Sequence, residues 1–218
     1  MELLEGLATT RAIRRYLPDP VPEADLATIL WHATRAPTGS NRQSYRFVVL
    51  RDTELGRRAK ALLGDAFRSS WNDKRRQGGF DEGSGRDPSS PKARAAAAMQ
   101  YYVDRLEQVP VIILPCLVRY REANPYEGAS IYPTCQNLLL AARALGYGGV
   151  LTMWHQGVET ELRSLLGIPA SAAISATITL GVPQGHHGPV RRRPLVDVVA
   201  DGHWESSASW AVEPGAGS

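Results

Sequence analysis

Apolar and polar residues alternate along the chain with two periods, one typical of helices and one typical of strands. Between residues 23 and 35 the apolar side chains share one side of a helix, and Pro37 follows as a stop signal. The run at 111–118 is almost wholly apolar, as in a strand buried on both faces. The same patterns predict helices at 3–10, 53–63, 92–108, 129–146 and 159–166, and strands at 45–50, 149–153 and 173–180. Because helices alternate with strands, residues 1–218 are predicted to form one mixed α+β domain.

Two segments lack a regular pattern. Residues 69–91 are rich in Gly, Ser, Arg and Asp, and we expect a mobile excursion or lid there, with plain surface disorder as an equal alternative. After Gly181 the tail also shows little periodicity. No internal repeat and no domain linker interrupts the rest, which keeps the prediction at a single domain.

Composition narrows the class of protein. The 218 residues are 43% hydrophobic and 22% charged, and 25 basic against 22 acidic residues give a net charge of +3. This bias is too weak to favour nucleic acid, and the basic cluster Arg191–Arg193 lies in a Pro-bounded loop rather than on a helix. No stretch approaches 18 apolar residues, and the N-terminus lacks a signal-peptide core, so we expect a cytoplasmic protein without a membrane span. Cys116 and Cys135 are expected to be buried free thiols.

The usual catalytic motifs are absent. No G-x-S-x-G elbow and no Walker loop occurs, the carboxylates form no suggestive pair, and the five histidines lack metal-ligand spacing. We therefore expect no metal, and we expect the histidines, His155 among them, to be surface or capping residues. The glycines at 146–149 follow a helix and precede a strand, the reverse of the dinucleotide-binding order. They read as a helix C-cap and tight turn, with close approach of a flat ring still open. Such a chain suggests that a cofactor performs the chemistry.

Two polar features could bind such a cofactor. The loop PTGSNRQSY, residues 37–45, is either an ordinary turn or a surface that contacts a polar ligand. Arg11 and Arg14 are three residues apart, so on a helical turn they would point the same way and form a phosphate receptor. A solvated basic face is the equal alternative.

At these residues the chain resembles a known family. The stretch TRAIRRYLPDPVPEADLATILWHATRAPTGSNRQSYRFVVL is similar to the opening of the FMN-dependent nitroreductases. The blocks that carry the resemblance are 11–16, 36–45, 135–149 and the tail GVP with VRRRPLVDVV, and their order and spacing match over about the whole chain. Residues 69–91 match no motif.

The resemblance implies a nitroreductase-like α+β fold, with a mixed central β-sheet flanked by helices. It also implies an intertwined homodimer with FMN at the interface, in which a tail from residue 184 wraps the partner. The implied activity moves a hydride from NAD(P)H through FMN to a nitroaromatic or quinone-like small-molecule acceptor, with ping-pong kinetics. Alternatives are flavin storage with little turnover, reductive dehalogenation or flavin cleavage. For a 2′-phosphate of NADPH, the sequence offers Arg68, Lys74, Arg75 and Arg76.

The resemblance also assigns site residues. Arg11 and Arg192 would bind the FMN phosphate, and Arg14 would lie at the flavin pyrimidine edge and tune the flavin electrostatically. Ala12 stands where the family commonly has Ser, so one hydrogen bond worth about 0.5–1.5 kcal/mol is lost. The residues implied in cofactor binding are Arg11, Ala12, Arg14, Pro37, Thr38, Gly39, Asn41, Gln43, Leu151, Thr152, Met153 and Arg192.

Overall fold

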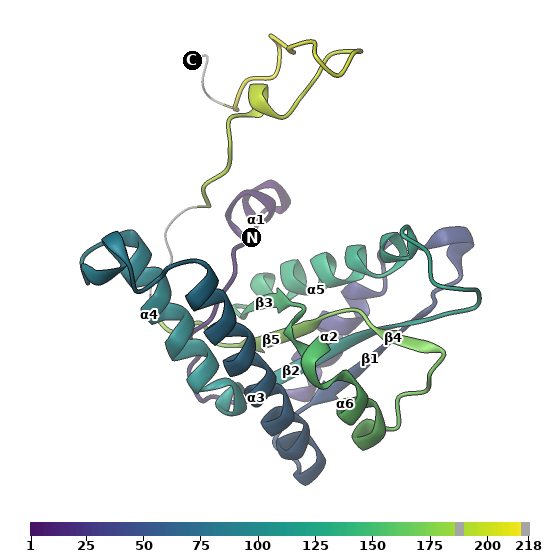
Figure 1. The fold of residues 1–218 in the computed structure, drawn as a ribbon. Coiled ribbons are helices and arrows are strands. Elements are labelled where there is room, and N and C mark those ends of the chain that lie inside the picture. The colour runs from purple at the N-terminus through teal and green to yellow at the C-terminus, as the bar shows by residue number, and fades with distance from the viewer. Residues whose placement is uncertain (186–189, 215–218) are drawn as a thin grey trace. The chain divides into compact units, whose positions relative to one another are not determined.

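The first unit of the chain is a β-sheet covered by helices on both faces. The computed structural model describes residues 1–185 and 190–214, and the chain divides into two units, Met1–His186 and His187–Ser218. In the first unit, helices α3 and α4 form a hairpin and the strands run behind it (Figure 1). The helices are α1 (Leu3–Thr9), α2 (Glu23–Ala33), α3 (Glu54–Gln77), α4 (Pro91–Asp104), α5 (Tyr132–Ala144) and α6 (Glu159–Leu166). The strands are β1 (Tyr45–Leu50), β2 (Val111–Val118), β3 (Gly148–Thr152), β4 (Ala172–Ile174) and β5 (Thr177–Gly181).

Strand β2 is at the centre of the core and explains the layers. Val111 and Ile113 pack on one side with residues of α2 and α5, whereas Ile112, Leu114 and Cys116 pack on the other with residues of α3, α4 and α6. Side chains of a strand alternate between its two faces, so a strand covered on both sides is apolar throughout. The burial of β2 confirms the prediction made from its continuous apolar run.

The predicted mixed sheet needs a correction. In the described residues the path is β1-β2-β5-β3, with β4 also on β2, and every strand pairing is antiparallel. The connections explain this. Between β1 and β2 the chain makes a hairpin of two helices, which returns it to the end of the sheet it left. The single helix α5 does bring β3 parallel to β2, but β5 inserts between the two strands with the opposite direction.

The predicted strand at 173–180 is two strands separated by a bulge. Cys116 pairs with Ile174, but Ile113 pairs with Ile178, so the register slips by one residue between them. Pro115 lies at this point of β2 and has no N–H to donate, although its carbonyl accepts from the N–H of Ser175 at 2.8 Å. Proline thus breaks the ladder, and the bulge faces the segment that follows β3.

Helix α3 continues beyond the predicted end at residue 63. Thr53 caps it, accepting from the N–H of Gly56 at 3.0 Å, and the helix ends only at Gln77. Trp71 is buried and donates its Nε1–H to Gln100 of α4 at 2.9 Å. Contacts with α4 therefore support residues 69–77, which composition assigned to an irregular excursion. Only the stretch from 78 to 90 lacks an α-helix, and its role as a lid stays a prediction.

The second unit has little regular structure. Its described part contains a 3₁₀ turn at Leu195–Asp197 and an isolated bridge between Ala200 and Ser207. The expected wrapping of this tail around a partner stays a prediction.

Two further expectations about single residues and surfaces can be compared with the structure. Cys116 and Cys135 are buried free thiols, as predicted, and burial raises the pKa of each to about 11. Within the described residues, no helix combines the length and the apolar character needed to cross a membrane.

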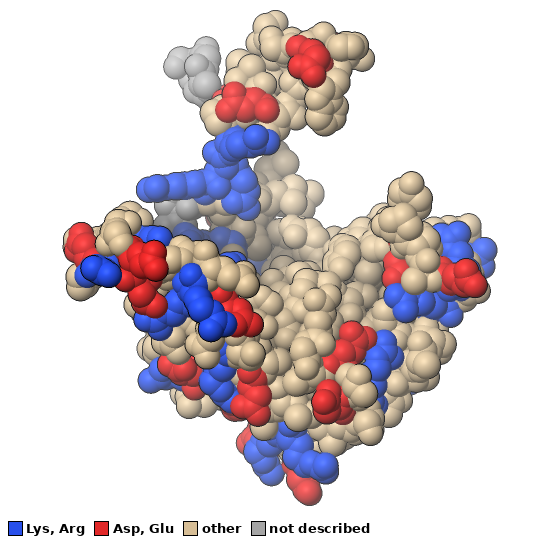
Figure 2. All heavy atoms as spheres, viewed as in Figure 1, with Lys and Arg blue, Asp and Glu red and all other residues tan. Residues whose placement is uncertain are grey.

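On the face shown in Figure 2, charges of both signs mix over the α3–α4 hairpin, while the part where α5 and β3 lie is uncharged.

Candidate functional site

The segment that carries Arg11 and Arg14 lies along the sheet. The N–H of Ile13 donates to the carbonyl of Gly149 at 3.0 Å, and the N–H of Leu17 donates to Val182 at 2.9 Å. The segment is extended rather than helical, so the helical argument for Arg11 and Arg14 was wrong. Two of its N–H groups pair with β3 and with the residue after β5 instead of forming a helical turn.

The glycines of the 146–149 cluster make this approach possible. A Cβ added at Gly148 would lie 2.6 Å from Cγ1 of Ile13, and one added at Gly149 would lie 2.7 Å from the carbonyl oxygen of Thr179. Gly146 has a φ of +88° just after α5, as a helix C-cap requires. The cluster thus forms a C-cap and allows close packing of protein on protein.

Arg14 is the predicted residue with the clearest need for a ligand. Its Nε is buried and has no hydrogen-bond partner among the described residues. Arg14 lines a pocket of ≈270 Å³ together with Tyr16, Tyr102 and Arg105. An unsatisfied buried donor is unfavourable by about 1–3 kcal/mol, more when charged, so the pocket suits a ligand with an acceptor atom.

A network of hydroxyl groups lies beside Arg14. The Thr179 hydroxyl is 2.8 Å from the hydroxyl of Tyr16 and 2.9 Å from that of Tyr102. Burial raises the pKa of both phenols, and the Arg14 guanidinium partly offsets this rise. Both phenols are therefore neutral at physiological pH, and they surround Arg14 with dipoles rather than with counter-charges.

The end of β3 presents further unpartnered polar atoms. Thr152 pairs with Thr177 across the strands, and the hydroxyls of both are buried without a hydrogen-bond partner in the described part of the chain. Leu151 and Met153, on either side of Thr152, are half-buried. Leu151 and Thr152 end β3, the strand against which the arginine segment packs, and Met153 follows directly.

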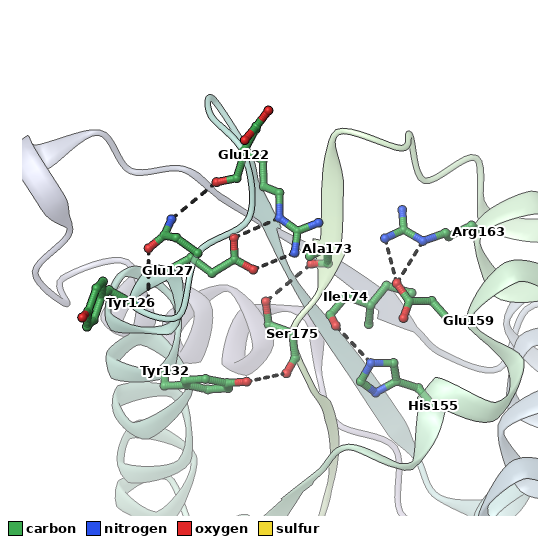
Figure 3. Close-up of polar contacts among 12 residues, drawn as sticks. Glu122, Tyr126, Glu127, Tyr132, His155, Glu159, Arg163, Ala173, Ile174 and Ser175 are labelled. Carbon is green, nitrogen blue, oxygen red and sulfur yellow. Dashed lines mark hydrogen bonds and ion pairs between the residues drawn. The ribbon is translucent and has the colours of Figure 1, made fainter.

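His155 is a residue that sequence reasoning misjudged. It is buried, and its Nε2 donates to the carbonyl of Ile174 at 3.0 Å, which leaves Nδ1 as an acceptor without a partner among the described residues (Figure 3). Burial lowers its pKa. Ile174 is the last residue of β4, so His155 fastens the turn after β3 to the end of β4, just before the bulge. In the sequence, its position next to Trp154 and two residues after Met153 was the available signal of burial.

The loop at 37–43 is strained and exposed. Ser40, Asn41 and Gln43 have φ values of 54°, 50° and 51°, in the left-handed region that non-glycine residues rarely adopt. Such a conformation is unfavourable by about 1–3 kcal/mol per residue, and it persists only where the surroundings enforce it. Here the Thr38 hydroxyl accepts from the N–H of Gln43 at 3.0 Å, and the N–H of Gly39 donates to Ser130 at 3.3 Å. Strain of this kind is common at ligand sites.

A single chain does not bring this loop to the arginine segment. The loop precedes β1, whereas residues 151–153 end β3, and these two strands lie at opposite ends of the path β1-β2-β5-β3. Three strand spacings of about 4.8 Å separate them by about 14 Å. The structure thus places the segment of Arg11, Ala12 and Arg14 against the start of β3, at Gly148 and Gly149, and leaves Pro37–Gln43 apart. Arg192 is exposed and belongs to the second unit, so its pairing with Arg11 stays a prediction.

Comparison with known proteins identifies the family. A model of the Nitroreductase family matches residues 7–182. The chain belongs to the nitroreductase family. An NADH dehydrogenase of Thermus thermophilus is 32% identical to it over 87% of this chain and 90% of the relative. A putative NADH dehydrogenase/NAD(P)H nitroreductase of Archaeoglobus fulgidus is 29% identical over 84% and 86%.

Solved structures of nitroreductases share the fold. A mutant of the FMN and NADPH-dependent nitroreductase NfnB of sphigopyxis sp. strain HMH matches with a TM-score of 0.71 at 20% identity, covering 93% of this chain and 99% of that one. An oxidized iodotyrosine deiodinase bound to FMN and 3-iodo-L-tyrosine matches with a TM-score of 0.68 at 18% identity, with the same two coverages. The predicted nitroreductase-like α+β fold is confirmed, apart from the direction of its strands.

Proposed function

We propose that this nitroreductase is an FMN-dependent oxidoreductase that carries a hydride from NADH or NADPH to a nitroaromatic or quinone-like acceptor. The observation that carries the proposal is the set of buried polar atoms around β3 that have no hydrogen-bond partner among the described residues. The Arg14 Nε and the Thr152 hydroxyl are buried on elements that pack together, and a flavin ring offers both donors and acceptors along its pyrimidine edge. The names of the relatives support the same cofactor and the same co-substrates.

The residues that would hold FMN follow from their chemistry. Arg11 and Arg192 would bind its phosphate, and Ala12 and Leu151–Met153 would lie along the cofactor. Bound FMN supplies a two-electron carrier that accepts a hydride from the nicotinamide and passes it to the acceptor. Donor and acceptor use one place in turn, which gives ping-pong kinetics. Arg14 would stabilise the negative charge that the cofactor gains on reduction, since a fixed cation in a partly buried site is effective there.

A homodimer would complete the site. Strand β1, which the loop Pro37–Gln43 precedes, is three strand spacings or about 14 Å from β3 in its own chain, so in our proposal the loop contacts the flavin of the partner subunit. The uncharged surface over α5 and β3 in Figure 2 suits a subunit interface, because interface centres are poor in charged residues. The dimer gives the strained loop its ligand.

The test combines spectroscopy with a change at Arg14. The purified protein should carry or take up FMN, and NADH or NADPH should bleach the flavin band. Arg14→Gln should make the flavin midpoint potential more negative, because the reduced anion loses its neighbouring cation. The matched control is Arg15→Gln, since the Arg15 guanidinium lies over the ring of Tyr101 and should leave the potential unchanged. Equal potentials for both variants would remove Arg14 from the mechanism, and a protein that takes up no FMN would remove the proposal itself.

Reductive dehalogenation is the second candidate. An iodotyrosine deiodinase of Danio rerio is 25% identical over 79% of this chain, and the match spans 57% of that protein. Halide release from an iodinated phenol, measured against nitroaromatic reduction with the same reduced protein, separates the two. Flavin storage stays the third reading, and it would be favoured if neither NADH nor NADPH bleaches the flavin.

A further inference from the structure

Two arginines from different loops lie over one tyrosine ring. The Arg42 guanidinium carbon is 4.3 Å from the centre of the Tyr120 ring, and that of Arg121 is 5.4 Å from the same centre. Arg42 belongs to the strained loop at 37–43, and Tyr120 and Arg121 follow β2. A guanidinium stacked on a ring keeps the N–H donors of its edge available, which suits it to a phosphate group.

The pocket around this stack carries a net positive charge. It is lined by Arg42, Arg119 and Arg121 with Glu127 as the acidic residue, so three cations face one carboxylate. Arg119 is already neutralised, because it forms a two-pronged ion pair with Glu127 at 2.6 and 2.9 Å. Among the described residues, neither Arg42 nor Arg121 forms an ion pair of its own. Two guanidiniums therefore remain for an anion.

An aromatic side chain stands beside the two cations. Tyr126 lines the same pocket and is 79% exposed, although a tyrosine ring is largely apolar. Figure 3 shows it directed away from the ion pair that Glu127 forms. Aromatic rings of this kind stack on purine bases, with about 1–3 kcal/mol per base in nucleic-acid complexes. The pocket thus combines the groups that recognise a phosphorylated adenosine.

Three of the four cations suggested by sequence suit this role less well. Arg68 is paired with Asp65 and Glu107, Arg75 binds Asp81 through two atoms, and Arg76 is paired with Asp73. A guanidinium that already binds a carboxylate would have to break that pair to take a phosphate. Among the described residues, Arg42 and Arg121 bind no competing carboxylate.

We propose that Arg42 and Arg121, held over Tyr120, bind the 2′-phosphate of NADPH and make it the preferred hydride donor. This inference rests on the proposed function. It places the adenosine end of the donor next to the loop at 37–43, which in the dimer would contact the flavin of the partner subunit. The nicotinamide end can then reach that flavin while the 2′-phosphate stays on the stacked arginines.

Donor kinetics of the FMN-loaded protein give the first test. Arg121→Gln should raise the KM for NADPH by about tenfold or more and leave both the KM for NADH and the kcat unchanged, because NADH lacks the 2′-phosphate. Arg121→Gln is the deciding variant, because Arg42 lies in the loop at 37–43 that would contact the flavin of the partner subunit. Arg58→Gln, an exposed arginine of α3, is the matched control and should change neither constant. Equal losses with NADH and NADPH would overturn the proposal.

A binding experiment tests the site without turnover. Adenosine 2′,5′-bisphosphate should bind the loaded protein and compete with NADPH, whereas adenosine 5′-monophosphate should bind at least tenfold more weakly. Equal affinity for the two nucleotides, or affinity that Arg121→Gln does not lower, would refute the 2′-phosphate site. If the flavin is bleached by NADH alone, this inference fails while the proposed function stands. If neither donor bleaches it, the proposed function fails and the nucleotide titration still decides the binding site.

Discussion

Thr179 connects the hydroxyl network beside Arg14. Removing its hydroxyl should reverse the sign of the effect that Tyr102→Phe has on the free energy of unfolding. Its hydroxyl serves Tyr16 and Tyr102, at 2.8 and 2.9 Å, and all three side chains are at least largely buried. Tyr16 also contacts the carbonyls of Ile13 and Thr179. For Tyr102 the Thr179 hydroxyl is the one hydrogen-bond partner in the described residues. Thr179→Val keeps the shape and removes only the polar atom.

The magnitude follows from these contacts. Thr179→Val removes one hydrogen bond to Tyr16, about 1 kcal/mol, and leaves the Tyr102 hydroxyl buried and unpaired, a further 1–3 kcal/mol or so. We expect the free energy of unfolding to fall by about 2–4 kcal/mol. Tyr102→Phe alone should lower it by about 1 kcal/mol, since Thr179 keeps its bond to Tyr16. In the Thr179→Val background the same Tyr102→Phe change should raise stability, because it removes the unpaired hydroxyl.

The assay is urea unfolding of the four flavin-free proteins at one protein concentration, with the slope m compared first. Thr177→Val is the control. It is the same substitution two residues earlier in β5, at a buried hydroxyl that has no partner in the described structure, and it should be neutral or stabilising. If Tyr102→Phe destabilises the protein equally with and without Thr179→Val, the network does not exist as described.

Two further predictions concern pH and assembly. The folded-state pKa of His155 lies below its ordinary value of 6.5, so the unfolded chain binds the proton first and stability should fall as pH drops below about 6.5. Urea titrations from pH 7.5 to 5.5 should show this loss in the wild type and a flatter profile in His155→Gln; equal slopes would contradict it. Mixed dimers of an Arg14→Gln chain with an Asn41→Leu chain should recover about half of the wild-type activity, because a site shared between subunits leaves one of the two sites intact. Activity no higher than the mean of the two parental proteins would place both residues in one chain's site.

Local patterns were sufficient for many elements of the fold. The strands Tyr45–Leu50 and Val111–Val118 and the helix Glu159–Leu166 have the predicted bounds, because their apolar periodicity and turn residues agree. The end of α3 could not be predicted in this way. Trp71 reads as an isolated aromatic residue in a polar stretch, and only its burial against α4 explains the continued helix. The split at β4 and β5 likewise depends on Pro115, which is distant in sequence.

The candidate site was predicted by resemblance more than by pattern. The family motifs lead to Arg14 and Thr152, and each has a buried polar atom that lacks a hydrogen-bond partner among the described residues. The composition of the loop at 37–43 indicates a turn but not the left-handed φ values of Ser40 and Gln43. The bond from the N–H of Gly39 to Ser130, which is distant in sequence, has no local signature. His155 was missed because its partner is a main-chain carbonyl, which has no sequence signature.

The unpartnered atoms have a consequence for stability. Arg14 Nε, the hydroxyls of Thr152 and Thr177, and Nδ1 of His155 all lie on β3, on its neighbours or on the turn after it. Native proteins rarely leave buried polar atoms unpaired. Where such atoms occur, a bound ligand, ion or water can supply the missing hydrogen bond. The chain alone bears this unfavourable term, and any ligand that pairs with these atoms removes it from the folded state only. A cofactor that binds here therefore stabilises the fold in two ways, through its own contacts and by pairing with these atoms. The local stability of apo and loaded protein should differ most strongly in β3 and least in the α3–α4 hairpin.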